Sequence, residues 1–302
     1  MNPGNPPTHL ILQNSQQGPA LDAGIVANIA QLAGSAQTHQ LNQHAWRIDS
    51  SNPGNPGNPG NPANPTQRAE IDVLCQQHAI DANFLPANLR LADFKLVAMD
   101  MDSTLITIEC IDEIADMQGL KPQVAAITEA AMRGELDFCA SLTRRVALLK
   151  GLDAGALQRV YDERLQLSTG AEAMLKHVQA AGLKTLLVSG GFNFFTERLQ
   201  KRLGLDFIHA NTLEIEDGKL TGRVLGKIVD AEEKKHTVQR ISAQLGFTPQ
   251  QAIVMGDGAN DLQMMSIAGL SLAYRAKPVV RQQASVALHF CGLDGLINFF
   301  NP

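Results

Sequence analysis

Residues 97–106 read VAMDMDSTLI: a short apolar run, two aspartates one residue apart, then a serine and a threonine. The apolar run predicts a buried β-strand, and Asp100 and Asp102 come where that strand ends. Two carboxylates this close repel each other at neutral pH unless a cation lies between them or one of them is protonated. The pair therefore indicates a divalent metal, acid–base chemistry or both, with a plain surface turn as the alternative.

Two common ion- and phosphate-binding loops are excluded by their spacing. A calcium-binding loop starting at the first aspartate needs Gly at its sixth position and Glu at its twelfth, where this chain has Leu105 and Ile111. A P-loop ending at Lys227 fails because Ile228 follows the lysine and position 221 is not glycine.

Two further apolar strands end in turns that could carry chemistry. Residues 184–191 read KTLLVSGG, and residues 252–261 read AIVMGDGAND. Strands that alternate with helices predict a parallel sheet covered on both faces, and ligands bind beyond the carboxyl ends of such strands. We therefore expect these two turns and the Asp-Met-Asp turn to meet at one site.

The third turn nearly matches a dinucleotide-binding G-x-G-x-x-G, but its last position is Asp261, and Asp257 would repel a bare phosphate. If Mg²⁺ bridges Asp100, Asp257 and a phosphate oxygen, the same acids become ligands of the kind this cation prefers. Asn260 or Asp261 could also cap the next helix. In the second turn, Ser189 and the glycine N–H groups could contact a phosphate, although a plain tight turn has the same sequence.

The composition sets broad limits. The chain has 302 residues, 44% of them hydrophobic, enough for one large domain or two. Its net charge of −5 gives no general attraction to nucleic acid or to an anionic membrane. Widely spaced cysteines without a C-x-x-C pair, and the lack of a signal-peptide pattern, favour a cytoplasmic protein with reduced thiols. A homodimer is compatible with the sequence.

The N-terminal part differs in composition from the rest. Residues 51–65, SNPGNPGNPGNPANP, predict a linker or long loop. Before them we expect a strand at HLILQ, a helix over 20–33 and one strand over 38–48, which together form half of a βαβ module. We therefore expect a small α+β module over residues 1–90.

Residues 91–302 are expected to form the main domain, an α/β fold with a doubly wound parallel sheet. From about 108 to 182 the apolar spacing is almost wholly helical, which predicts an all-α insertion after the first strand. Its helices are expected at residues 109–117, 121–132, 137–149, 154–165 and 171–181.

The motifs D-x-D-S-T, S-G-G, a later lysine (Lys234) and G-D-G-x-N-D occur in this order, and residues 94–291 resemble the haloacid dehalogenase (HAD) superfamily of aspartate-nucleophile phosphatases. Segments such as MDMDSTLITIECIDEIAD and SGGF resemble the phosphoserine phosphatases within it. The resemblance implies a Rossmann-like core, a helical cap over the site and an N-terminal module like an amino-acid-binding ACT domain.

The resemblance further implies Mg²⁺-dependent hydrolysis of O-phospho-L-serine, the last step of serine biosynthesis. Asp100 would be the nucleophile that forms an aspartyl-phosphate, and Asp102 the general acid and base. The metal ligands would be Asp100, the Asp102 backbone carbonyl and Asp257. Related substrates such as phosphothreonine or phosphohomoserine, and an amino-acid-binding regulatory protein, are the alternatives.

The resemblance also assigns substrate contacts. Ser189, Gly190, Lys234 and Asn260 would hold the phosphoryl group, and Asp261 would orient the lysine or the metal shell.

In the cap, Glu109 would bind the substrate ammonium and Arg145 its carboxylate, although composition alone makes each a solvated helix charge. Arg145 is seven residues after Phe138, so the two share a helix face from which Arg144 points away. Met132 and Phe138 would form apolar walls or belong to an ordinary core.

Overall fold

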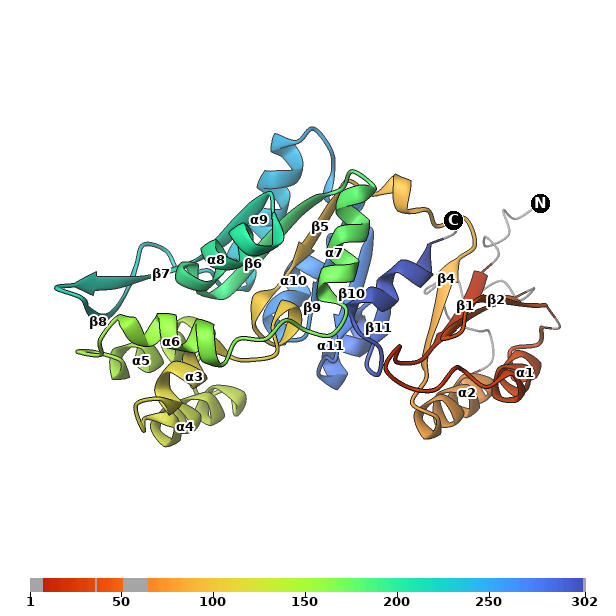
Figure 1. The fold of residues 1–302 in the computed structure, drawn as a ribbon, viewed down its shortest axis with the longest axis horizontal. Coiled ribbons are helices and arrows are strands. Elements are labelled where there is room, and N and C mark those ends of the chain that lie inside the picture. The colour runs from red at the N-terminus through yellow and green to blue at the C-terminus, as the bar shows by residue number, and fades with distance from the viewer. Residues whose placement is uncertain (1–7, 36, 51–64, 301–302) are drawn as a thin grey trace.

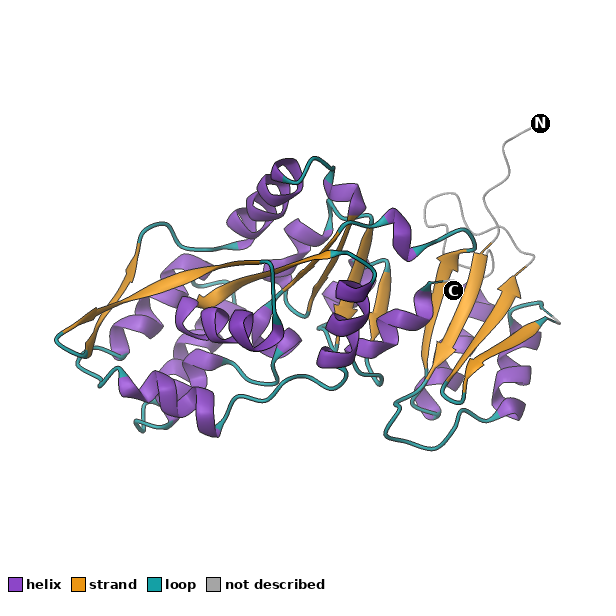
Figure 2. Cartoon of the chain, turned by 45° about the horizontal axis from the view of Figure 1, so that its top comes forward, coloured by secondary structure: helices purple, strands orange, loops and turns teal. Residues whose placement is uncertain are grey.

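The computed structural model describes residues 8–35, 37–50 and 65–300 and contains two separate sheets (Figure 2). The predicted linker lies, apart from Pro65, outside the described residues. A four-stranded sheet belongs to the N-terminal module and a seven-stranded sheet to the rest of the chain. Among the described helices, none has both the length and the apolar composition needed to cross a membrane.

The larger sheet has the strand order β11-β10-β9-β5-β6-β7-β8. Neighbouring strands are parallel except for β7 and β8, which form an antiparallel hairpin. The strands are β5 (Leu96–Met99), β6 (Lys184–Phe192), β7 (Phe207–Glu216), β8 (Lys219–Leu225), β9 (Ala252–Gly256), β10 (Leu270–Tyr274) and β11 (Val286–Leu288).

Helices cover both faces of this sheet, as expected for a doubly wound fold. All four residues of β5 are fully buried, and they alternate between two cores. Val97 and Met99 pack with α7 (Ala171–Ala180) and α8 (Asn193–Leu203). Leu96 and Ala98 pack with α9 (Ala231–Gln244) and α10 (Leu262–Met265). A continuous apolar run is what a central parallel strand requires, because neither of its faces meets water.

The chain between β5 and β6 is helical, but its helices lie in two places (Figure 1). Four of them lie together beyond the carboxyl end of the sheet: α3 (Cys110–Asp116), α4 (Lys121–Met132), α5 (Phe138–Leu148) and α6 (Gly155–Glu163). The last helix, α7, lies apart from them, beside β6 and the segment Leu293–Phe299. The β7–β8 hairpin supports the four-helix group, since the Gly151 and Ala154 N–H groups donate to the Leu220 and Gly218 carbonyls, each at 2.8 Å.

Neighbouring strands of the N-terminal sheet are antiparallel, and the expected strand–helix–strand order opens a small α+β module. The strand order of the sheet is β2-β3-β1-β4, with β1 (Thr8–Gln13), β2 (Thr38–Asn42), β3 (Ala45–Ser50) and β4 (Asp81–Pro86). Two helices, α1 (Ala23–Leu32) and α2 (Pro65–Gln77), share its apolar core. The single strand predicted over 38–48 is a hairpin, because the Asn42 side chain accepts from the His44 N–H at 2.8 Å and closes a turn there.

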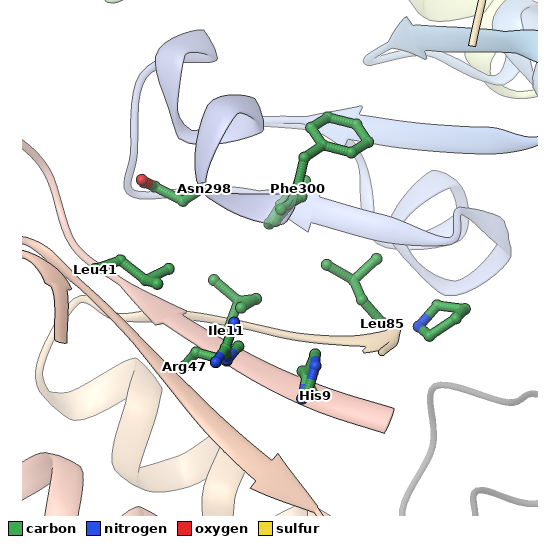
Figure 3. A pocket seen from close by; sticks show the side chains of 9 residues that line it. His9, Ile11, Leu41, Arg47, Leu85, Asn298 and Phe300 are labelled. Carbon is green, nitrogen blue, oxygen red and sulfur yellow. The ribbon is translucent and has the colours of Figure 1, made fainter. Parts of the chain in front are cut away.

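Side chains join the two sheets where β4 runs beside β11, a junction that we call the seam. Asn83 donates to the Ala287 carbonyl at 2.9 Å and accepts from the Ala287 N–H at 2.8 Å, like a rung of a β-ladder. Asp81 accepts from the N–H groups of residues 289–291, and burial raises its pKa even though these bonds oppose the shift. On the other side of this seam, Ile11 and Leu85 lie opposite Phe300 (Figure 3). The helix α11 (Pro278–Gln283) precedes β11.

Candidate active site

The carboxyl ends of β5, β6 and β9, which are neighbours in the sheet, open into a cavity of about 710 Å³. Three helices of the four-helix group, α3, α4 and α5, form its opposite wall. The three predicted turns therefore meet at one place. Eight of the predicted site residues line the cavity: Asp100, Asp102, Glu109, Arg145, Ser189, Gly190, Asp257 and Asn260. The ninth, Lys234, is only 1% exposed and lies behind Asp100.

The turn after β5 places its two aspartates differently. Asp100 is buried, and its Oδ1 accepts from the Met101 N–H at 2.7 Å. After Asp102, Ser103 adopts a left-handed φ of 56°, which turns the chain sharply. The Asp102 Oδ1 accepts from the Cys110 N–H at 3.0 Å, at the start of α3. Asp102 is therefore held by the first residue of the helical wall, whereas Asp100 is held by the sheet.

Lys234 is a buried cation with two carboxylate partners. Its Nζ lies 2.8 Å from Asp100 Oδ1 and 2.8 Å from Asp261 Oδ1. Burial alone would lower its pKa, but the two carboxylates more than offset this and raise it, so the side chain is an ammonium. Lys234 lies in the first turn of α9, where Asp230 caps the helix by accepting from the Glu233 N–H at 2.9 Å.

Asp257 is the third acid at the sheet edge, and Thr104 donates to its Oδ1 at 3.1 Å. Burial, followed by the charge of Asp261, raises its pKa to about 6. The same two causes raise the pKa of Asp100 well above its usual value, although Lys234 opposes them. The cluster therefore holds more negative charge than the protein neutralises.

These acids fit a divalent cation. Oxygens of Asp100, Asp257 and Asp261 lie within 4.8 Å of one another, and three carboxylates face one ammonium, which leaves an excess charge of about −2. Asp261 has no free oxygen, because Lys234 occupies Oδ1 while the N–H groups of Asp257 and Gly258 both donate to Oδ2 at 3.1 Å. Asp100 and Asp257 are therefore the better ligands, with Asp261 holding the lysine.

The turn that follows Ser189 has no room for a side chain at Gly190 or Gly191. Pairing of β6 with β7 is irregular between Ser189 and Phe192, and the Gly191 N–H donates to the Ser189 Oγ at 2.8 Å. A Cβ at Gly190 would lie 2.7 Å from Phe138 Cζ, and one at Gly191 would lie 2.6 Å from Asp102 Oδ2. The two glycines thus let the backbone of this turn lie close to Phe138 and Asp102 and leave no room for a larger residue.

The helical wall carries the two predicted substrate anchors. Glu109 is exposed to the cavity and accepts from Ser103 Oγ at 2.8 Å. Loss of hydration, followed by the charge of Asp102, raises its pKa to about 7. Arg145 shares the cavity-facing side of α5 with Phe138, while Arg144 is exposed, as the helical spacing predicted. The Met132 side chain lies outside the described residues.

The cavity residues that the sequence reasoning missed include Asp112, Ser141 and Lys277. Asp112 follows Glu109 by three residues, and Ser141 lies between Phe138 and Arg145 on one helix face, so helical spacing could have found both. Lys277 is different. Its N–H donates to the Asp257 carbonyl at 3.2 Å, a contact between turns that no local pattern predicts.

Comparison with known proteins identifies the family of the chain. Residues 97–266 match the haloacid dehalogenase-like hydrolases. A phosphoserine phosphatase from Polaromonas sp. is 56% identical over 220 residues, 71% of this chain and 93% of that protein. One from Haemophilus influenzae is 47% identical over 218 residues, 72% of this chain and 69% of that protein.

Solved structures resemble the whole chain, including the N-terminal module. A HAD family hydrolase from Salmonella enterica serovar Typhi has a TM-score of 0.83 and 33% identity, covering 97% of this chain and 99% of that one. A probable phosphoserine phosphatase from Vibrio cholerae has a TM-score of 0.79 and 31% identity, covering 97% and 85%. The chain therefore belongs to the haloacid dehalogenase-like hydrolases and, within them, to the phosphoserine phosphatase family.

Proposed function

We propose that the chain is a cytoplasmic, Mg²⁺-dependent enzyme that hydrolyses O-phospho-L-serine to L-serine and phosphate, the last step of serine biosynthesis. One observation carries the proposal. A buried carboxylate paired with a buried ammonium lies at one end of a cavity whose opposite wall carries Glu109 and Arg145. The first pair suits a phosphoryl group and the second an α-amino acid. The names of the relatives point to the same substrate.

In the first step Asp100 attacks phosphorus, the bond from phosphorus to the serine oxygen breaks, and Asp102 gives its proton to that oxygen. In the second step Asp102 takes a proton from water, which attacks the aspartyl-phosphate and releases phosphate. Burial raises the pKa of Asp102 to about 6, so it can hold and give up a proton near neutral pH. Lys234, Ser189, Gly190 and Asn260 stabilise the charge on the phosphoryl oxygens.

Magnesium would be held by Asp100, the Asp102 carbonyl and Asp257, and when bound it offsets the repulsion between the nucleophile and the phosphate dianion. We further propose a division into an N-terminal module, residues 1–90, and a phosphatase domain, residues 91–302. The predicted cap over 108–182 would then comprise α3 to α6 as the moving part, because α7 packs on the sheet. The cap would exclude water while the ester is cleaved.

The test is phosphate release from phosphoserine with Mg²⁺ and with a chelator, next to phosphothreonine, phosphohomoserine and an Asp100→Asn variant. We expect turnover that needs the metal, prefers phosphoserine and is lost in the variant. Wild-type rates in Asp100→Asn would contradict the mechanism. Tight amino-acid binding with negligible turnover would favour a regulatory protein instead.

A further inference from the structure

Asp112 is a carboxylate on the cap wall that the proposed mechanism does not use. It lies on α3, whose N-cap residue is Glu109, and both residues line the cavity. Its Oδ1 is buried and has no hydrogen-bond partner among the residues that the structure describes. Because an unpaired buried carboxylate oxygen is costly, the position calls for a donor from a ligand.

The other acids of α3 do have partners. Glu113 and Asp116 both pair with Arg164, at 3.0 and 3.5 Å, and Asp116 also lies 3.8 Å from Lys121. These pairs lie on the side of the helix that does not line the cavity. The missing partner at Asp112 is therefore specific to the cavity side.

A matching unpaired donor lies in the same cavity. The Arg145 Nε is buried and also has no partner within the described part of the chain. No ion pair joins Asp112 to Arg145 among these residues, although their charges are opposite. A ligand that carries both an ammonium and a carboxylate would match the charges of both side chains, whereas a simple phosphomonoester offers no cation to Asp112.

Glu109 alone cannot meet the needs of an ammonium group. An ammonium has three N–H donors, and one Glu109 oxygen already accepts from Ser103. Asp112 is also among the charges that raise the pKa of Glu109, so the two carboxylates lie near enough to repel each other. A cation between them would remove this repulsion and supply the missing donors.

We propose that Asp112 is a specificity-determining residue that binds the substrate ammonium together with Glu109, so that the cap selects phosphorylated amino acids over other phosphomonoesters. The proposal rests on the proposed function and deepens it. Arg145 then binds the carboxylate, and the amino acid is held at two points. It predicts that neutralising Asp112 weakens selection for the ammonium and leaves selection for the carboxylate intact.

Three substrates separate these effects: phosphoserine, 3-phospholactate, which lacks the ammonium, and phosphoethanolamine, which lacks the carboxylate. In Asp112→Asn we expect kcat/KM to fall roughly 10- to 100-fold for the two ammonium-bearing substrates, the range of a lost charge-assisted hydrogen bond. For 3-phospholactate it should stay within about twofold of wild type, since that contact is absent. Asp116→Asn, on the same helix, is the matched control and should change none of the three, and Asp112→Glu should restore part of the selectivity.

Other outcomes overturn the proposal. If phosphoserine and 3-phospholactate lose activity equally while phosphoethanolamine does not, Asp112 orients Arg145 instead. If all three fall together, its role is structural.

Calorimetric binding of L-serine and L-lactate gives a readout without turnover. A serine preference that is present in wild type and lost in Asp112→Asn supports the assignment even if no phosphate is released, a result that would refute only the proposed catalysis. Turnover without any preference for the ammonium would refute the assignment alone.

Discussion

Gly191→Ala should disable Asp102 without touching it chemically. The new Cβ would lie 2.6 Å from Asp102 Oδ2, whereas ordinary contact begins at 3.4 Å, so one of the two must shift by about 0.8 Å. Asp102 is held from the other side by the Cys110 N–H at 3.0 Å and cannot move without losing that bond. A misplacement of about 1 Å in a reacting group costs about 10²-fold in rate, or about 2.7 kcal/mol of transition-state stabilisation.

The assay compares phosphoserine with p-nitrophenyl phosphate. Nitrophenolate leaves without a proton, so in the proposed mechanism only the second step needs Asp102 with that substrate. We expect kcat for phosphoserine to fall about 100-fold. With p-nitrophenyl phosphate the variant should release a burst of nitrophenol, about one per active site, before a slow steady state, because the aspartyl-phosphate accumulates.

Gly190→Ala is the matched control. Its Cβ would meet Phe138 Cζ at 2.7 Å, on α5 and not on Asp102. We expect it to raise KM more than it lowers kcat, and to show no burst. In urea unfolding, overpacking should lower the free energy of unfolding of both variants by about 1–3 kcal/mol, an effect separate from the change in kinetics. A Gly191→Ala enzyme with wild-type kcat for phosphoserine would refute the reasoning.

Three further outcomes follow from the structure. With a chelator present, Asp257→Asn should be more stable than wild type above pH 7 by about 3 kcal/mol. The reason is that the pKa of Asp257 rises from 3.8 to about 6 on folding, and each pKa unit corresponds to 1.36 kcal/mol of stability. As the pH rises, the Asp257 carboxyl loses its proton in the unfolded chain before it does so in the folded protein, so the stability of the wild type falls between these two pKa values. Urea titrations at pH 3.5 and 8 should show the higher stability of Asp257→Asn only at pH 8. Mg²⁺ should stabilise the wild type and not the variant. Lys277→Met removes a cation from an acidic cavity, so it should lower kcat/KM about fivefold at low salt and less at high salt. Lys176→Met on α7 is the control for this measurement. Asn83→Ala should cost about 2 kcal/mol in thermal unfolding, because it leaves both backbone groups of Ala287 unpaired; an unchanged midpoint would contradict the role of the seam.

The core and its reactive turns could be predicted because both depend on local patterns. Apolar runs with glycine or aspartate at their ends specify buried parallel strands and the place where they stop. The rule that ligands bind at the carboxyl ends then predicts from the sequence alone that Asp100, Ser189 and Asp257 lie together. Helical spacing likewise separated Arg145 from Arg144 correctly.

The remainder depends on contacts that are remote in sequence. The strand β4, DANFLP, was missed because Asp81 and Asn83 are poor strand formers, and their side chains serve the seam with residues 287–291. The hairpin at Asn42 was missed because its turn contains no glycine. The roles proposed for Glu109 and Arg145 rest on the family resemblance, since a charged side chain carries no local sign of the ligand it faces.

The acidic cluster shows that geometry, and not the number of charges, decides what each carboxylate does. Asp257 and Asp261 are four residues apart and both face Lys234 and Asp100, so neutralising either removes the same charge. Yet Asp261 is fully buried and its oxygens accept three donors, whereas Asp257 is half-buried and accepts one from a side chain. In Asp261→Asn the side-chain NH₂ group must point either toward the Lys234 ammonium or toward the two backbone N–H groups. Leaving those donors unpaired should lower the free energy of unfolding by about 3 kcal/mol. Asp261→Asn should therefore destabilise the metal-free protein while Asp257→Asn stabilises it, and equal signs for the two variants would mean that net charge alone governs the site.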